Sequence, residues 1–477
     1  SYYCLWKMIN QSVSVPTIMV VLGATGDLMR KKIVPALFNL YVSGRLPRLF
    51  HLIGVSRRDW DDNQFRKLLA NILIERGATA DPQFLKLWTY QRGGFETLAD
   101  YRRLAQSLGF FDNQWRVCAN KLFYIAAPPE HYAVILNHLH RSHLTDPCSP
   151  GEGFTRILIE KPFGKDQPTA ARLERTLSRR FKEEQIYRID HYLAKETLQN
   201  ILNFRFSNTL FEGVWSNQFI EKVRIRLWEK IGVEKRGVFY DGLGALRDVG
   251  QNHLLQMLAL VTMDHPGSFS IEAIRSRRLE LLRSLILPQA AEIKQQSYRA
   301  QYGGYQKIDG VRPGSTTETY FKITARLNHP RWRGVPFILE SGKRLKEIRK
   351  EIIISFKHPQ PCFCPPGTDH ELKNRVVFQL EPNEGVFVDL WSKKPGLHLG
   401  MKGQKFKFLI RPKQERAQYV EEYEKLILDA IMGDQTLFIS SQEVAAMWRF
   451  IDPIAAVWQQ QAVPLNHYRP DTDEPQL

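Results

Sequence analysis

Long apolar runs and a cysteine framework are both missing from this sequence. No stretch of about 18 apolar residues occurs in the 477 residues, so no membrane-spanning helix is predicted. The five cysteines are odd in number and have no framework spacing, which predicts free thiols in a reducing compartment. Cys362 and Cys364 lack the second ligand pair that a zinc site needs. No apolar leader begins the chain, and a cytoplasmic protein without membrane association is therefore expected.

Metal-ligand and nucleic-acid motifs are missing too. The spacings of His131, His138, His140 and His143 match no usual ligand motif, so they are predicted to lie on a solvated helix face and no metal is expected. The 67 Lys and Arg against 50 Asp and Glu give a net charge of +17, which suits nucleic acid, anionic lipid or phosphorylated small molecules. These cations are scattered singly and in pairs, and no RNA-binding signature accompanies them, so nucleic acid is not the expected partner.

The length predicts two or three domains, and the first begins with a nucleotide-binding pattern. Residues Thr17 to Leu22 are all apolar or β-branched and predict a buried strand, which ends in GATGDLMRKK at 23–32. Gly23 and Gly26 would let backbone N–H groups approach a pyrophosphate at a helix N-terminus. Pro35 predicts a helix that starts afresh after a first turn.

The next predicted strand, 51–55, ends in Ser56, Arg57 and Arg58. NAD enzymes usually carry an Asp or Glu there to bind the ribose 2′-hydroxyl, whereas an arginine accepts a 2′-phosphate. This position therefore predicts NADP as the cofactor.

Helices predicted at 63–76, 96–108 and 130–140 are separated by apolar strands at 121–127 and 156–160. This alternation predicts an α/β domain of the Rossmann-like type with a doubly wound parallel sheet. Lys161 follows the last of these strands at its carboxyl end, where open α/β sheets bind ligands. The alternative is an ordinary loop lysine.

The stretch RIDHYLAKE at 188–196 gathers Asp190, His191, Tyr192 and Lys195 before a helical pattern at 197–206. If the helix already included His191, Lys195 would lie one turn further on the same face, and an anion would fit between them. The alternative is a solvated helix start that Asp190 caps.

The second half changes its pattern. Alternating polar and apolar residues at 222–227, 375–380, 385–390 and 405–409 predict an antiparallel sheet with one wet face. Between the first and the rest, residues 239–263 form a glycine-rich entry into a long apolar helix, with Asp248 and His253 near its polar start. The fold class expected is thus α/β plus α+β, with a cofactor domain at 1–197 and a larger, mainly antiparallel substrate and oligomerisation domain at 198–477.

Several of these segments together resemble the glucose-6-phosphate dehydrogenase family over nearly the whole chain. RIDHYLAKE resembles the family's RIDHYLGKE, GATGDLMRKK its GASGDLAKKK, and RDVGQNHLLQML at 247–258 its RDVMQNHLLQML. EKPFG at 160–164, GSTTET at 314–319, VPFILESGKRL at 335–345 and NEGVFVDLWSKKPG at 383–396 follow in the family's order.

The resemblance implies oxidation of glucose 6-phosphate at C1 to the 1,5-lactone with NADP, by a homodimer or homotetramer. It assigns cofactor binding to Gly23, Thr25, Gly26, Asp27, Leu28, Arg57, Tyr124 and Lys161. It assigns substrate binding to Lys161, His191, Tyr192, Lys195, Glu229, Asp248 and Lys343, with Lys32 as a further contact. His253 would be the catalytic base and Asp190 the carboxylate that orients it, with Asp248 as the alternative orienting group.

Some positions depart from the family pattern. Ala194 replaces a glycine and Gly250 a methionine, while Ile348 stands where the family usually has a substrate-binding basic residue, for which Arg349 is a candidate substitute. The C-terminal NHYRPDTDEPQL lacks the family's usual ending.

Two rival functions remain open at this point. One is a non-catalytic relative whose basic surface binds a partner, which would have no chemical reason to keep Lys161, Asp190, His191, Lys195 and His253 together. The other is a Rossmann oxidoreductase acting on a non-phosphorylated sugar, against which Lys195 beside His191 argues.

Overall fold

The computed structural model describes residues 15–147, 152–361, 373–397, 400–410 and 421–475. The chain divides into two compact units. The first contains residues 1–164, 168–194 and 420–441, and the second contains residues 165–167, 195–419 and 442–477. The segment 420–441 thus returns to the first unit, whereas the sequence pattern had assigned it to the second. No helix in the described ranges is long and apolar enough to cross a membrane.

The first unit is built on a seven-stranded sheet in the order β15-β6-β5-β4-β1-β2-β3. All its neighbouring strands run parallel except β15, which pairs antiparallel with β6. Its strands are β1 (Thr17–Leu22), β2 (Phe50–Ser56), β3 (Trp88–Arg92), β4 (Asn120–Ile125), β5 (Thr155–Glu160), β6 (Ile186–Ile189) and β15 (Phe438–Ile439). The predicted first strand has the observed bounds, because every residue in it is buried.

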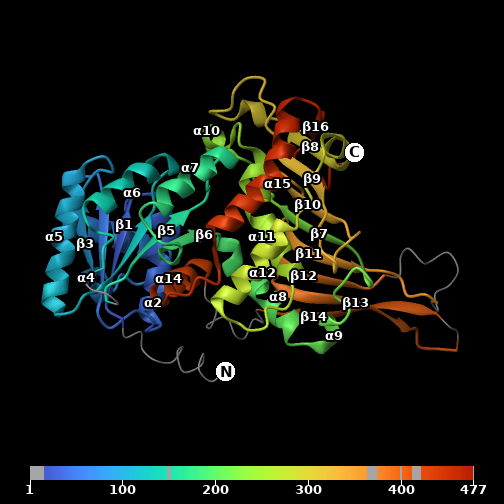
Figure 1. Ribbon diagram of the computed structural model, residues 1–477, viewed down its shortest axis with the longest axis horizontal. Helices are drawn as coiled ribbons and strands as arrows, with labels where there is room; N and C mark the ends of the chain where they lie inside the picture. Colours follow the sequence, from blue (N-terminus) through green and yellow to red (C-terminus); the bar gives the residue numbers. More distant parts are fainter. Residues whose placement is uncertain (1–14, 148–151, 362–372, 398–399, 411–420, 476–477) are drawn as a thin grey trace. The chain divides into compact units, whose positions relative to one another are not determined.

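Helices flank this sheet on both sides, as the doubly wound prediction requires (Figure 1). α2 packs against α3 and α14, while α5 packs against α6. The helices are α2 (Val34–Val42), α3 (Asp62–Glu75), α4 (Pro82–Lys86), α5 (Leu98–Trp115), α6 (Tyr132–Arg141), α7 (Gln167–Ser178) and α14 (Glu422–Met432), with short helical segments η1 (Met29–Ile33), η2 (Pro129–His131), η3 (Glu183–Gln185) and η4 (His191–Ala194). The solvated-face prediction is wrong for His138 in α6, which is 7 % exposed and contacts the Tyr101 ring.

The second unit contains a nine-stranded sheet in the order β14-β13-β12-β11-β7-β10-β9-β8-β16. It is mainly antiparallel, which confirms the prediction, but β7 pairs parallel with β10, and β8 with β16. The strands are β7 (Ile220–Trp228), β8 (Ser297–Tyr302), β9 (Tyr320–Ala325), β10 (Phe337–Gly342), β11 (Arg349–Phe356), β12 (Arg375–Glu381), β13 (Gly385–Lys393), β14 (Met401–Leu409) and β16 (Leu465–Tyr468).

Helices of the second unit cover one face of its sheet, and β13 and β14 extend beyond them (Figure 1). The helices are α8 (Glu196–Phe206), α9 (Thr209–Glu212), α10 (Gly237–Tyr240), α11 (Leu255–Thr262), α12 (Ile271–Arg283), α13 (Ala290–Gln296) and α15 (Ser441–Gln459), with η5 (Glu234–Arg236), η6 (Leu246–Leu254) and η7 (Tyr305–Lys307). The predicted long helix after the glycine-rich entry is present as η6 followed directly by α11, whereas α10 is a separate short helix before that entry.

The other face of this sheet carries charged side chains that form ion pairs, rather than side chains that are only exposed to solvent. On β7, Arg224 pairs with Glu340 at 2.8 Å, and Arg226 pairs with Glu351. Arg226 is only 9 % exposed, so these cations are held in ion pairs across neighbouring strands. The alternating cations predicted the strand correctly but are not free in solvent.

Candidate active site

The predicted glycine turn follows β1 directly. Gly23 has φ +97°, a left-handed conformation that favours glycine, and a Cβ there would collide with the Ala126 carbonyl oxygen. The N–H groups of Gly23 and Ala24 both donate to the Val55 carbonyl, at 2.9 and 3.0 Å. Neighbouring parallel strands thus fix the turn, and Thr25, Gly26, Asp27 and Leu28 follow at the start of the helical run.

Pro35 does not break this helical run. The segment before α2 is a π-helix, η1, in which the Val34 N–H donates to the Met29 carbonyl. A proline has no N–H for the carbonyl four residues before it, and here the Lys31 carbonyl accepts from Arg76 Nη2 at 2.5 Å instead. The wider turn carries Lys32, whose Nζ lies 5.6 Å from the centre of the Tyr423 ring.

Arg57 follows the carboxyl end of β2 and is exposed. Within the described ranges it makes no hydrogen bond or ion pair, so its guanidinium is available to a ligand. Its neighbour Arg58 is different, because its guanidinium lies 4.8 Å from the centre of the Trp60 ring. The two arginines at this turn therefore have separate environments.

A buried carboxyl group lies at the carboxyl end of β5. Glu160 accepts hydrogen bonds from the Tyr124 hydroxyl and, at 3.1 Å, from the Tyr423 hydroxyl. Burial raises the pKa of Glu160 to about 7, although both hydroxyls oppose the shift. The adjacent Lys161 is the second residue of the EKPFG segment. Sequence reasoning named Tyr124 and Lys161 but missed Glu160 and Tyr423; the acidic residue beside Lys161 was the one available signal.

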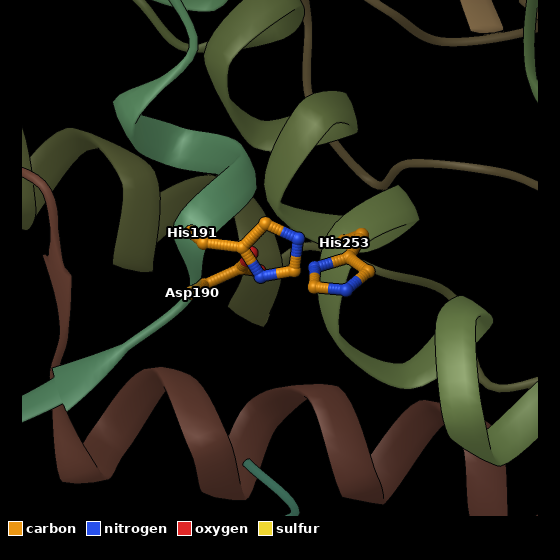
Figure 2. Close-up of side chains that lie close together, drawn as sticks. All are labelled: Asp190, His191 and His253. Atoms are coloured by element: carbon orange, nitrogen blue, oxygen red, sulfur yellow. The ribbon is translucent and has the colours of Figure 1, made fainter. Parts of the chain in front are cut away.

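Directly after β6, the chain forms a single 3-10 turn. The Tyr192 N–H donates to Asp190 Oδ1 at 3.0 Å, so Asp190 caps this turn. The His191 ring lies 4.9 Å from the Tyr192 ring and 6.3 Å from the Tyr423 ring, both between centroids. Figure 2 shows Asp190 and His191 as consecutive residues beyond the strand. The Tyr423 ring thus lies near Lys32 and His191. Its hydroxyl shares the Glu160 carboxylate with the Tyr124 hydroxyl.

The expected shared helical face of His191 and Lys195 is wrong. Lys195 has ψ 132°, an extended conformation, and it is the N-cap residue of α8, which begins at Glu196. The turn before it is 3-10, so a continuous α-helix with four-residue spacing does not exist here. In the second unit, Lys195 Nζ lies 3.4 Å from Glu381 Oε1.

Glu229 and Lys343 form an ion pair in the second unit. They follow β7 and β10, whose parallel register aligns Trp228 with Gly342. Lys343 Nζ also lies 5.6 Å from the centre of the Tyr240 ring. The atypical C-terminus supports this pair, because the Tyr468 hydroxyl donates to the Lys343 carbonyl at 2.6 Å. Tyr468 was not foreseen, since nothing in its local sequence connects it with Lys343.

Asp248 and His253 lie in η6, a nine-residue π-helix. Such wide turns are frequent at functional sites. Both residues are buried, at 7 % and 3 % exposed, and the His253 N–H donates to Asn252 Oδ1 at 2.6 Å. Figure 2 shows the His253 side chain on this segment. The glycine at 250 has a packing reason, because a Cβ there would lie 2.8 Å from Phe321 Cζ.

One further expectation needs correction. Cys118 is disulfide-bonded, so the prediction that all five cysteines are free thiols is wrong; their odd number did not exclude a single pair. The other four cysteines lie outside the described residues. Arg349, the candidate substitute at the Ile348 position, pairs with Glu347 and lies over the Trp228 ring at 5.2 Å.

The predicted site residues thus fall into two sets. The first unit carries Gly23, Thr25, Gly26, Asp27, Leu28, Lys32, Arg57, Tyr124, Lys161, Asp190, His191 and Tyr192. The second unit carries Lys195, Glu229, Asp248, His253 and Lys343.

Comparison with known proteins covers both units. Residues 20–200 match the family model described as "Glucose-6-phosphate dehydrogenase, NAD binding domain", and residues 202–477 match "Glucose-6-phosphate dehydrogenase, C-terminal domain". A glucose-6-phosphate 1-dehydrogenase of Chlamydia muridarum is 35% identical, over 93% of this chain and 90% of the relative. One of Aggregatibacter actinomycetemcomitans is 38% identical, over 91% and 90% of the two chains.

Solved structures agree with these matches. A glucose-6-phosphate dehydrogenase in complex with its substrate glucose 6-phosphate superposes with a TM-score of 0.88 at 30% identity, covering 97% of this chain and 96% of the other. The glucose-6-phosphate 1-dehydrogenase from Mycobacterium avium gives a TM-score of 0.82 at 27% identity, covering 96% of each chain.

Proposed function

Since the chain belongs to the glucose-6-phosphate dehydrogenase family, we propose that it oxidises D-glucose 6-phosphate at C1 to 6-phospho-D-glucono-1,5-lactone, with NADP⁺ as hydride acceptor. This reaction is the first step of the oxidative pentose phosphate pathway. The observation that carries the proposal is the match of both family models, which together span residues 20–477 apart from residue 201. The alternative of a non-catalytic relative with a basic partner-binding surface is not favoured.

The first unit offers the elements of an NADP site. The Gly23 turn leads into a helical run, and a pyrophosphate is stabilised at such a helix N-terminus. Arg57 is the partner for the 2′-phosphate, because a guanidinium binds phosphate oxygens bidentately. Tyr124 and Lys161 belong to the nicotinamide end. When bound, NADP⁺ supplies the acceptor for the hydride that leaves C1.

For the sugar, we assign the 6-phosphate to His191, Tyr192 and Lys195. Glu229 and Asp248 bind the hydroxyl groups. Lys343 contacts the same part of the substrate, which its ion pair with Glu229 supports. Lys161 contacts both substrates, and Lys32 is a further contact.

His253 is the catalytic base in this proposal. As hydride leaves C1, the C1 hydroxyl must lose its proton, and an imidazole is suited to accept it near neutral pH. The lactone carbonyl then forms from the C1–O bond while His253 keeps the proton. Asp190 fixes the tautomer of His253 and stabilises the imidazolium, as an aspartate does in hydrolase triads. Its capped turn after β6 supports this role, because Tyr192 N–H restrains the carboxylate.

Oligomeric state and location are also proposals. A homodimer or homotetramer that uses the large sheet is supported by the edge strand β14, where Phe406 and Phe408 are 54% and 57% exposed. A cytoplasmic location fits a substrate and cofactor that are phosphorylated metabolites. The disulfide at Cys118 argues in the opposite direction, and thiol titration of protein purified without reductant would test it.

One assay tests the reaction. Purified protein is mixed with glucose 6-phosphate and either NADP⁺ or NAD⁺, and reduced coenzyme is followed by its absorbance. We expect turnover with NADP⁺, and free glucose should react far more slowly. No turnover with glucose 6-phosphate and either coenzyme would refute the proposed function.

A further inference from the structure

Two lysines of the second unit share one carboxylate. Lys195 Nζ lies 3.4 Å from Glu381 Oε1, and Lys350 Nζ lies 3.0 Å from Glu381 Oε2. The two lysine side chains are 10% and 13% exposed, whereas that of Glu381 is 31% exposed. Both ammonium groups therefore reach one small anionic group at the edge of the solvent.

The backbone fixes this arrangement. Lys350 and Glu381 are cross-strand partners in the antiparallel register of β11 and β12. Lys195 joins them from the N-terminus of α8, where the Thr197 hydroxyl also donates to the Gln379 carbonyl at 3.4 Å. Three separate elements thus hold the two ammonium groups around one point, and the spacing does not depend on a single flexible side chain.

Arg349, adjacent to Lys350 in sequence, is directed to other partners. It pairs with Glu347 and lies over Trp228. Ile348 is 41% exposed and carries no charge. In the segment 348–350, Lys350 pairs with Glu381, and the same carboxylate pairs with Lys195.

We propose that Lys350 is a second phosphate-binding cation and a specificity-determining residue for the 6-phosphate of the sugar. This inference rests on the proposed function, in which Lys195 binds that phosphate. Two ammonium groups that both reach one carboxylate also both reach the oxygens of one phosphate placed beside it. The two ammonium groups attract a phosphate monoester, which carries nearly two negative charges.

The test compares Lys350→Met with wild type in steady-state kinetics. We expect the KM for glucose 6-phosphate to rise about tenfold, the size of one lost charge-assisted bond, with kcat and the KM for NADP⁺ nearly unchanged. The inhibition constant of inorganic phosphate, used as a competitive inhibitor, should rise by a similar factor. The slow oxidation of free glucose should stay the same, because it presents no phosphate.

Matched variants separate this role from a general loss of charge. Lys346 is 63% exposed and pairs with Asp473, so Lys346→Met removes the same charge nearby and should leave the KM unchanged. Lys350→Arg keeps the charge and should restore most of the affinity, even if Lys350→Met melts at a lower temperature.

An unchanged KM and inhibition constant in Lys350→Met would overturn the inference, as would an equal loss in Lys346→Met. A KM that rises in Arg349→Met instead would transfer the role to Arg349. These results differ from failure of the proposed function, because that failure would leave wild-type protein inactive with glucose 6-phosphate.

Discussion

In both units, candidate residues follow the carboxyl ends of parallel strands, although the two sheets are of different types. In the first unit, Arg57, Lys161 and Asp190 each follow the carboxyl end of a parallel strand, as ligand-binding residues do in open α/β sheets. In the second, Glu229 and Lys343 follow β7 and β10, a parallel pair inside a mainly antiparallel sheet. A local parallel pair is therefore sufficient to bring two polar side chains together at one edge.

Arg57 of the first unit and the candidate lysines of the second unit are held differently. Arg57 has no ion pair within the described ranges, whereas Lys195 pairs with Glu381 and Lys343 with Glu229. In the second unit the carboxylates orient the cations before a ligand binds. Substitution of Lys195 or Lys343 therefore affects both the site and the paired carboxylate. In the first unit, removal of Arg57 should affect the ligand alone.

The largest effect is expected at His253. His253→Asn should lower kcat by about 10² to 10⁴, because it removes the base, with little change in substrate binding. Asp190→Asn should cost a comparable factor, and the double variant should fall little further, because the two act together. Steady-state kinetics with both substrates provide the measurement.

His265→Asn is the matched control, since His265 is exposed and accepts a hydrogen bond from the Gly267 N–H. Near-normal kcat in His253→Asn, combined with lost affinity for glucose 6-phosphate, would contradict the assignment and move the base to His191. Additive losses in the double variant would separate the role of Asp190 from that of His253.

Lys195→Ala is expected to have the next largest effect. The KM for glucose 6-phosphate should rise about tenfold to a hundredfold, because a charge-assisted bond to the phosphate is lost. Oxidation of free glucose should hardly change. Since Lys195 also pairs with Glu381, a thermal melt should accompany the kinetics. Equal losses with both sugars would mean that Lys195 takes part in the chemistry.

Local patterns predicted the parts of the fold whose burial is uniform or strictly alternating. β1 was predicted with its observed bounds, and β7, β12, β13 and β14 were recognised by their alternation. The strands β8 to β11 were not predicted. β10 and β11 lack strict alternation, whereas β8 and β9 alternate over short runs that were not recognised. The π-helices η1 and η6 were also missed, since their extra residue per turn leaves no mark in the apolar pattern.

Long-range partners explain what was missed at the site. The Tyr423 hydroxyl bonds Glu160 across 263 residues, and the Tyr468 hydroxyl bonds Lys343 across 125. Such pairs follow from tertiary packing, and one sequence carries no signal for them. The family resemblance supplied roles for positions that match its motifs, but it gave no information on Lys350, whose partner is set by the register of β11 and β12.

Coenzyme choice tests the role of Arg57 in the first unit. Arg57→Ala should raise the KM for NADP⁺ about tenfold and leave that for NAD⁺ nearly unchanged, because only NADP⁺ carries the 2′-phosphate. Arg58→Ala is the control, as Arg58 stacks on Trp60. Equal losses with both coenzymes in Arg57→Ala would show that Arg57 supports the fold instead.

The smallest expected effect concerns Glu160, whose pKa burial raises to about 7. At pH 6 its carboxyl group is mostly protonated and resembles a glutamine amide in shape, so Glu160→Gln should have kcat/KM within about twofold of wild type. At pH 8.5 the Glu160 carboxylate of the wild type is ionised and accepts strong hydrogen bonds from the Tyr124 and Tyr423 hydroxyls. The variant should then be about threefold less active, because those hydroxyls lose a charged acceptor.

The same substitution changes how stability depends on pH. In the unfolded chain Glu160 ionises near its ordinary pKa of 4.5, whereas the folded protein keeps the proton until about pH 7. The folded state therefore binds more protons across that window, and the free energy of unfolding falls as pH rises from 4.5 to 7. Glu160→Gln has no proton to lose and should show a shallower decline in urea titrations at several pH values, whereas Glu130→Gln, at an exposed position, should follow wild type. An unaltered slope in Glu160→Gln would mean that the carboxyl group is ionised well below pH 7, and the activity difference should then persist at pH 6.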